Sequence, residues 1–206
     1  MVALGLGQLG HAVVGVDLSP AMLAQAVGRV GPSVAVADAA LLPLRSGSLD
    51  MAYSVWVLHL VADIPCVLSE VARVLRPDGR YAVIPAHQRR EGSDDVAPFM
   101  EAMHQALSGS TIRPDDPEAL RRLAPAAGLV VDAVLSTLPM QFTMAPRQVA
   151  DRIMARSFSI LWDVDDVQWA EVVAPTVEAI LSLPDPDRPR PIVQRHPIAV
   201  LRKTRP

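Results

Sequence analysis

Cysteine and aromatic residues are scarce in this sequence: Cys66 is the single cysteine of 206 residues, and aromatic residues make up 4%. One cysteine excludes a disulfide framework and a metal site built from several cysteines. No run of about 18 apolar residues is free of charged residues, glycine and proline, so no transmembrane helix is predicted. No basic stretch precedes an apolar segment at the N-terminus, so no signal peptide is predicted. These absences favour a cytoplasmic protein that does not enter a membrane.

The charge is nearly balanced, with 19 Lys and Arg against 22 Asp and Glu, and a formal net charge of −3. Nucleic-acid-binding domains need a basic surface, so we expect no nucleic-acid partner. Apolar residues are 50% of the chain, which excludes a disordered protein. This length favours one domain with a substantial core. The composition leaves the oligomeric state open.

Short apolar runs alternate with helical patterns through the first half. Strands are predicted at 12–17, 33–38, 50–58, 81–85, 129–137 and 198–202. Helices are predicted at 20–28, 64–75, 95–107, 116–128, 146–158 and 164–183. This alternation is typical of an α/β fold, with a mostly parallel sheet and helices on both faces. A turn is predicted at residues 76–80, in which Gly79 supplies the positive φ.

The N-terminal segment GLGQLG, residues 5–10, matches the G-x-G-x-x-G pattern of dinucleotide-binding loops. That pattern needs a strand before it, a helix opening from it and an acid about 20 residues later. Here a strand follows almost at once, and Asp17 comes too early. We therefore interpret residues 2–9 as the end of a helix with Gly10 as its C-cap. A nicotinamide-dependent oxidoreductase stays as an alternative that these glycines alone support.

Four segments, in order, resemble the class I S-adenosylmethionine-dependent methyltransferases. They are HAVVGVDLSPAML (11–23), VADAALLPL (36–44), GSLDMAYSVWVLH (47–59) and EVARVLRPDGR (70–80). They are similar to the second strand with its helix, the third strand, the fourth strand, and the helix and turn before the fifth strand. The small-molecule enzymes of the ubiquinone and menaquinone type are the most similar subgroup. The resemblance implies a Rossmann-like α/β domain, S-adenosylmethionine as cofactor, and methyl transfer to a small-molecule acceptor.

The resemblance also implies the cofactor-binding residues, which follow the carboxyl ends of predicted strands. Asp17 would accept hydrogen bonds from the ribose hydroxyls, and Asp38 one from the adenine amino group. The Ala39 N–H would serve an adenine ring nitrogen, Met22 would cover the adenine face, and Ser54 would lie beside the cofactor. Structural alternatives stay open, since either acid can form a local turn or cap and Met22 can be a core residue.

The family's Gly-rich loop and the strand before it are absent from the sequence, because spacing aligns Met1 with the helix after that loop. The missing strand is central in the family, so we expect a gap in the sheet or a new strand pairing. We expect either a truncated chain, which the spacing favours, or a first segment rebuilt from residues 1–10. The alternative function is accordingly a non-catalytic methyltransferase-like remnant that does not bind cofactor.

No residue is identified as catalytic. His59, His87 and His104 are candidates for a general base if the acceptor is a hydroxyl, and a structural role is the alternative for each. No histidine pair has metal-ligand spacing, so no metal is expected. We expect residues 1–206 to form one methyltransferase-like domain, in which about 89–111 and 140–190 are a substrate cap or additional helical segments.

Overall fold

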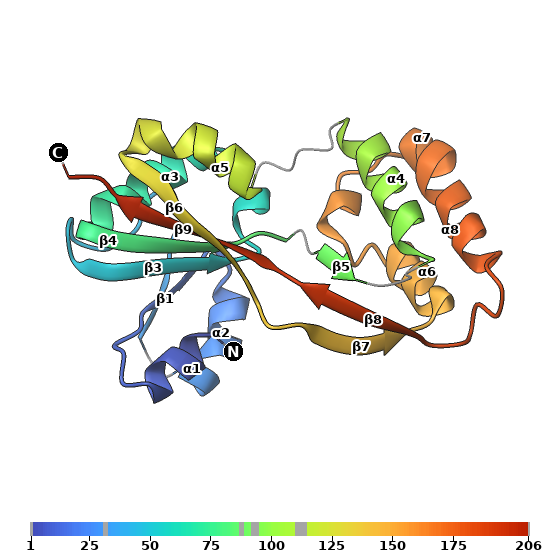
Figure 1. Cartoon of the computed structure of the whole chain (residues 1–206), viewed down its shortest axis with the longest axis horizontal. Helices are drawn as coiled ribbons and strands as arrows, with labels where there is room; N and C mark the ends of the chain where they lie inside the picture. Colours follow the sequence, from blue (N-terminus) through green and yellow to red (C-terminus); the bar gives the residue numbers. More distant parts are fainter. Residues whose placement is uncertain (1, 31–32, 87–88, 92–94, 110–114, 206) are drawn as a thin grey trace.

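The computed structural model describes residues 2–30, 33–86, 89–91, 95–109 and 115–205. Figure 1 shows two lobes that lie side by side along the longest axis of the molecule. The first lobe contains most of the first half of the chain, and the second lobe is mainly helical. The chain passes between the lobes from β6 to β7 through residues 137–139 and from β8 to β9 through His196, so the final strand returns to the first lobe.

The first half alternates between helices and strands, as predicted. Its elements are α1 (Val2–Gln8), β1 (Gly15–Asp17), α2 (Pro20–Val30), β2 (Val34–Val36), β3 (Leu49–Val55), η1 (Leu58–Leu60), α3 (Ile64–Val74) and β4 (Leu75–Ile84). The third strand ends earlier than predicted because Trp56 has a φ of 56°, which turns the chain out of the extended conformation.

The second half contains every helix that the sequence predicts, together with short strands that it does not. Its elements are β5 (Arg89–Glu91), α4 (Ala97–Ser108), α5 (Pro117–Leu123), η2 (Ala124–Ala127), β6 (Leu129–Ser136), β7 (Met140–Met144), α6 (Pro146–Met154), η3 (Ser159–Leu161), α7 (Asp166–Gln168), η4 (Trp169–Val173), α8 (Ala174–Leu181), β8 (Arg190–Arg195) and β9 (Pro197–Lys203). The helix predicted at 164–183 is interrupted by the π-helical turn η4.

The strands form mixed sheets with parallel pairs in the first half. β3 and β4 are parallel, and β9 and β6 add antiparallel strands to give the order β3-β4-β9-β6. In the second lobe β5, β8 and β7 pair antiparallel. Helices α3 and α5 lie on one side of the four-stranded sheet, and α1 and α2 lie on the other (Figure 1). This is the α/β arrangement with helices on both sides that the sequence predicts, but the sheet is mixed where it was predicted to be mostly parallel.

The sheet has a gap where one was expected. β1 and β2 form a separate parallel pair, and within the described residues β1 pairs only with β2 and β3 only with β4. The N-terminal segment is helix α1, and Gly10 follows it with a φ of 88°. The His11 N–H donates to Leu6 O at 3.1 Å, which closes the predicted C-cap. The early glycines therefore form no phosphate-binding turn.

Each lobe has its own hydrophobic core. In the first lobe the apolar face of α3 packs on β4, β9 and α5, and its most enclosed side chains include Leu68, Leu75, Tyr81, Leu120, Leu129 and Leu201. The helix begins where Asp63 accepts a hydrogen bond from the Cys66 N–H at 2.9 Å. In the second lobe the core joins α4, α6 and α8 through Met103, Ile153, Leu161, Val173 and Ile180.

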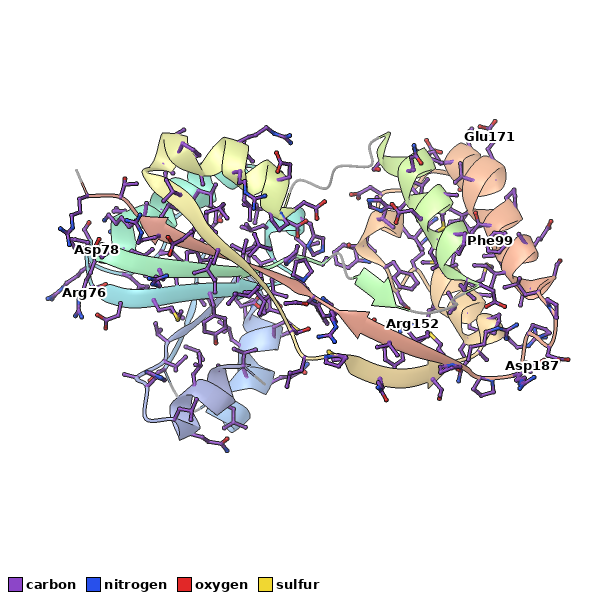
Figure 2. The ribbon with its side chains drawn as sticks, viewed as in Figure 1. Arg76, Asp78, Phe99, Arg152, Glu171 and Asp187 are labelled. Atoms are coloured by element: carbon purple, nitrogen blue, oxygen red, sulfur yellow. The ribbon has the colours of Figure 1, made fainter. Side chains whose placement is uncertain are left out.

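The turn predicted at residues 76–80 is a bulge inside β4. Leu49 is paired with Leu75 and Met51 with Arg80, so the residues between them bulge out of the ladder. The positive φ belongs to Asp78, at 62°, and not to Gly79 as predicted. Asp78 lies at the end of the sheet away from the second lobe (Figure 2) and accepts a hydrogen bond from Arg205 at 2.6 Å. That bond lowers the pKa of the Asp78 carboxyl.

Gly79 is needed for space, because a Cβ there would meet the Arg76 carbonyl oxygen at 2.8 Å. We expect Gly79→Ala to lower the free energy of unfolding by about 1–3 kcal/mol, since backbone must move to admit the methyl group. Gly28→Ala is the matched control, because a Cβ at Gly28 meets nothing within 4 Å. It should be neutral or stabilise α2 by up to about 1 kcal/mol. Urea unfolding of both variants measures their free energies of unfolding, and equal values would contradict the conclusion that Gly79 is needed for space.

The segment between β2 and β3 is held onto α3 by a charged network. Glu70 accepts hydrogen bonds from the Leu42 N–H and from Arg73, both at 2.7 Å. Arg73 also donates to Leu42 O and to Ser46 Oγ, both at 3.1 Å. The bond from Arg73 lowers the pKa of Glu70, burial opposes this, and the Leu42 N–H adds to the lowering. The network therefore fixes residues 42–46, midway between β2 and β3.

A carboxylate whose pKa is lower in the folded state stabilises the protein above its unfolded pKa, and this contribution disappears as the pH falls through the folded pKa. Glu70→Gln should therefore cost about 1–3 kcal/mol at pH 7 and much less at about pH 3, below the ordinary value of 4.5. Glu118→Gln is the control, because its pair with Arg121 is exposed and should change stability by less than about 0.5 kcal/mol. A pH-independent loss for Glu70→Gln, measured by urea unfolding, would refute this role.

Candidate functional site

The carboxyl ends of β1 and β2 lie side by side because the two strands are parallel and in register. Asp17 is paired with Val36 at the last position of both strands. Beyond that pair the Ala37 N–H donates to Asp17 O at 3.1 Å, and Asp38 follows immediately. The structure therefore brings both predicted acids to one edge of this pair, the kind of edge where open α/β sheets bind ligands.

Asp17 has a local structural role and a spare oxygen. Its Oδ1 accepts a hydrogen bond from the Ser19 N–H at 2.8 Å, and Ser19 Oγ accepts one from the Met22 N–H at 3.4 Å. Together these contacts begin helix α2 at Pro20. Oδ2 of Asp17 accepts no hydrogen bond from any described residue, and the side chain is exposed. The carboxylate is thus held in place with one oxygen available to a ligand.

Asp38 repeats this geometry. Its Oδ1 accepts a hydrogen bond from the Ala40 N–H at 2.8 Å, and its carbonyl oxygen accepts one from the Leu41 N–H at 2.9 Å. The Ala39 N–H between them donates to no described residue. A free carboxylate oxygen and a free N–H therefore stand on adjacent residues, which is a donor and acceptor pair that fits the edge of a base.

Met22 is not a core residue. Its side chain is 55% exposed on the first turn of α2, whereas the next residue, Leu23, is 6% exposed and faces inward. The core alternative is therefore wrong, and Met22 presents an apolar, polarizable surface next to the strand ends.

Ser54 lies apart from the other predicted residues, on β3 in the four-stranded sheet. Its Oγ forms a hydrogen bond with the Tyr81 hydroxyl at 2.8 Å, on the face that α3 covers. Burial raises the pKa of Tyr81 to about 12, so the phenol stays protonated. This contact engages the Ser54 hydroxyl within the four-stranded sheet, apart from the β1–β2 edge.

The four residues of the β1–β2 edge fit the nucleoside half of S-adenosylmethionine. Two fixed carboxylates suit hydroxyl and amino donors, a free N–H suits a ring nitrogen, and a methionine suits a flat base. The described residues offer no Gly-rich loop for the methionine half, because Gly5 and Gly7 lie inside α1. Within the same part of the chain no cluster of His, Cys, Asp and Glu could hold a metal ion.

A second group of polar and aromatic residues gathers at the ends of β3 and β4. His59 Nδ1 in η1 lies 3.6 Å from Asp115 Oδ2, and Asp115 also accepts a hydrogen bond from the Ala86 N–H at 3.2 Å. The Trp56 ring lies 5.5 Å from that of the buried His196, between β8 and β9. Sequence reasoning named His59 but missed Asp115 and His196.

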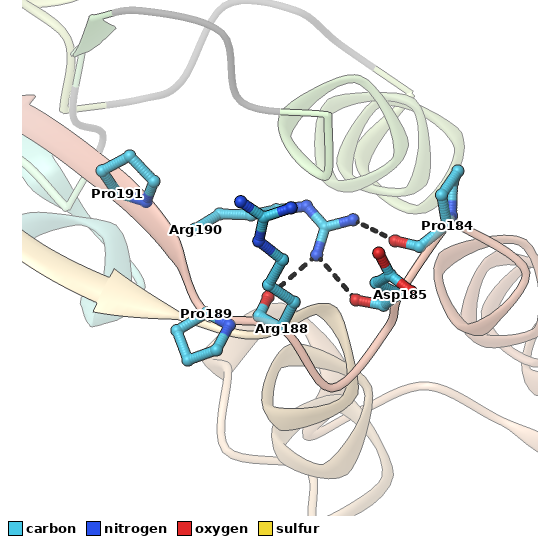
Figure 3. Close-up of a pocket in the computed structure, with 6 residues that line it drawn as sticks. All are labelled: Pro184, Asp185, Arg188, Pro189, Arg190 and Pro191. Atoms are coloured by element: carbon cyan, nitrogen blue, oxygen red, sulfur yellow. Dashed lines mark hydrogen bonds between the residues drawn. The ribbon is translucent and has the colours of Figure 1, made fainter.

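Of the other histidine candidates, His104 is partly buried on α4, and His87 lies outside the described residues. The pocket in Figure 3 is also remote from the strand ends, because it lies on the loop between α8 and β8. Arg190 fills it by donating to the carbonyl oxygens of Pro184, Asp185 and Arg188. It also pairs with Asp95 at 2.8 Å, so the loop has a structural role.

Comparison with known proteins finds similarity to methyltransferases. Residues 1–83 match a family model described as a methyltransferase domain. The arsenite methyltransferase of Halobacterium salinarum is 26% identical over 185 residues, or 87% of this chain and 42% of that protein. The demethylmenaquinone methyltransferase of Symbiobacterium thermophilum is 36% identical over 81 residues, or 36% of this chain and 32% of that protein. The chain thus spans less than half the length of these relatives.

Among solved structures, a candidate methyltransferase from Bacillus halodurans superposes with a TM-score of 0.57 at 15% identity, covering 94% of this chain and 83% of that one. This likeness confirms the Rossmann-like α/β fold. None of the helices in the described part of the chain combines the length and the apolar character needed to cross a membrane. In the sequence of residues 1–83 and in its fold, the chain is thus similar to the class I S-adenosylmethionine-dependent methyltransferases of the small-molecule type.

Proposed function

We propose that this chain transfers a methyl group from S-adenosylmethionine to a small-molecule acceptor, with the nucleoside part of the cofactor held at the ends of β1 and β2. The observation that carries the proposal is the pair of exposed carboxylates on adjacent parallel strands. A backbone N–H fixes one oxygen of each, and the other oxygen has no partner among the described residues.

Each residue of this edge has one contact to make. Asp17 accepts hydrogen bonds from the ribose hydroxyls, and Asp38 accepts one from the adenine amino group. The Ala39 N–H donates to an adenine ring nitrogen, and Met22 covers the base. Hydrogen bonds to charged groups contribute about 1.5–3 kcal/mol each, so the two acids dominate the affinity.

The second lobe is the place for the acceptor. β3 and β4 point their carboxyl ends toward this lobe (Figure 1), and β8 runs from it through His196 into β9. When bound, the cofactor supplies a methyl group on a positively charged sulfur, so the leaving group is neutral. The chain then needs mainly to align the acceptor atom with the methyl carbon and to exclude water, which is a proximity effect. We assign alignment to the β3 and β4 ends and the cap role to the second lobe.

Titration calorimetry with S-adenosylmethionine tests the proposal. Asp17→Asn keeps the acceptor that bonds to the Ser19 N–H, but it replaces the spare oxygen by an amide that cannot accept a hydrogen bond. We expect its affinity to fall by about 10–100-fold, and Asp38→Asn to lose about 10-fold. Asp151→Asn on α6 is the control and should change affinity by less than about twofold, because Asp151 is exposed in the second lobe.

Two outcomes contradict the proposal. If the wild-type chain melts cooperatively and yet does not bind S-adenosylmethionine, the non-catalytic remnant is the better description. If the chain binds NADH in the control titration and not S-adenosylmethionine, the strand-end acids serve another nucleotide.

A further inference from the structure

His59 and Asp115 meet where separate segments converge. His59 lies in η1, just after β3, and Asp115 precedes α5. The carboxylate of Asp115 is 1% exposed, and its Oδ2 accepts the N–H of Ala86, which follows β4. The same oxygen lies 3.6 Å from Nδ1 of His59. The pair thus lies at the carboxyl ends of two parallel strands. These ends face the second lobe, where the acceptor is placed.

Two buried atoms of this pair lack hydrogen-bond partners among the described residues: His59 Nδ1 and Asp115 Oδ1. Burying a carboxylate oxygen or an imidazole nitrogen without a hydrogen bond is unfavourable. If Nδ1 carries a proton, a shift of the two side chains by a few tenths of an ångström lets it donate a hydrogen bond to Asp115 Oδ2. The buried ring nitrogen then has a partner. Asp115 therefore selects the Nδ1–H tautomer of His59, since the partner of one ring nitrogen decides the state of the other.

This tautomer leaves the lone pair of Nε2 free. The His59 side chain is 19% exposed although its Nδ1 is enclosed, and Nε2 is not among the buried side-chain atoms that lack a hydrogen-bond partner. An imidazole with Nδ1 held by a carboxylate and Nε2 open is arranged to take a proton from a bound molecule.

Trp56 provides an exposed surface directly after β3, three residues before this base. Its ring is 50% exposed and lies against His196 at an interplanar angle of 43°. The backbone N–H of Trp56 donates a hydrogen bond to Ile84 O at 2.9 Å, and this bond holds the residue at a φ of 56°. A bulky residue in the left-handed region is strained, and such strain persists where the surroundings fix a side chain for a purpose. A half-exposed indole suits a flat aromatic molecule.

We propose that the acceptor is an aromatic hydroxyl compound, that His59 is the catalytic base that takes its proton, and that Asp115 is the positioning residue. This inference rests on the proposed function. The acceptor oxygen forms a bond to the methyl carbon while the C–S bond breaks and its electron pair goes to sulfur. The hydroxyl proton passes to His59 Nε2, and the resulting imidazolium is stabilised by Asp115 until the proton leaves to water.

The tautomer of His59 tests the pair without any cofactor or acceptor. We expect nitrogen NMR of the full chain, ¹⁵N-labelled at histidine, to show Nδ1–H and an unprotonated Nε2 at mildly alkaline pH. Asp115→Asn should shift that equilibrium toward Nε2–H, and Asp116→Asn, at the next residue, should not. An Nε2–H tautomer in the wild-type chain overturns the proposal, even if Asp115→Asn fails to fold. So does a tautomer that is unchanged in a folded Asp115→Asn.

Transfer from radiolabelled S-adenosylmethionine to two phenols tests the base. His59→Gln should slow methylation of 4-methylphenol by about 100-fold or more, because that hydroxyl keeps its proton. Methylation of 4-nitrophenol, which ionises readily, should slow by less than about threefold. Equal slowing of both overturns the role of His59, and so does failure of the wild-type chain to methylate either phenol while it binds S-adenosylmethionine. Calorimetry distinguishes failure of the role proposed for His59 from failure of the proposed function. His59→Gln should bind S-adenosylmethionine as the wild type does, whereas failure of the proposed function would appear as a wild-type chain that does not bind it.

Discussion

The parallel pairing of β1 with β2 is the constraint on which the candidate cofactor site depends. A three-residue ladder brings the ends of both strands together, and the bond from the Ala37 N–H to Asp17 O extends it by one step. Each acid then closes a turn onto the backbone N–H two residues later, at 2.8 Å in both cases. The orientation of both carboxylates is therefore decided by the backbone, before any ligand is considered.

The gap in the sheet divides the site into two parts. The β1–β2 pair holds the residues suited to a nucleoside, whereas β3, β4 and the second lobe hold the residues suited to an acceptor. Each part is ordered by its own contacts: the strand pairing on one side, and the core around α3 with Tyr81 on the other. The proposed methyl transfer needs both parts to face the same methyl group, so in this proposal the cofactor is the link between them.

Local signals in the sequence predicted most of the fold. The apolar stripe of α3, the cap at Gly10 and the short buried strands depend on nearby residues, and the structure contains them. The strands β5 and β8 were missed because they are short and carry charges or a proline without a period of two. The strand β7, MQFTM, does alternate apolar and polar residues, and this signal was overlooked because it spans only five residues. The contact between His59 and Asp115 joins distant segments, and so no local pattern could predict it.

Amide chemical-shift mapping with S-adenosylhomocysteine tests the central claim most directly, because it locates the ligand on the chain residue by residue. The account predicts that the amides of Ser19, Ala39 and Ala40 move most, that those at the end of β3 move less, and that those of α8 and the loop after it do not move. Shifts confined to α1 or to the second lobe, or no shift in a cooperatively folded chain, would contradict it.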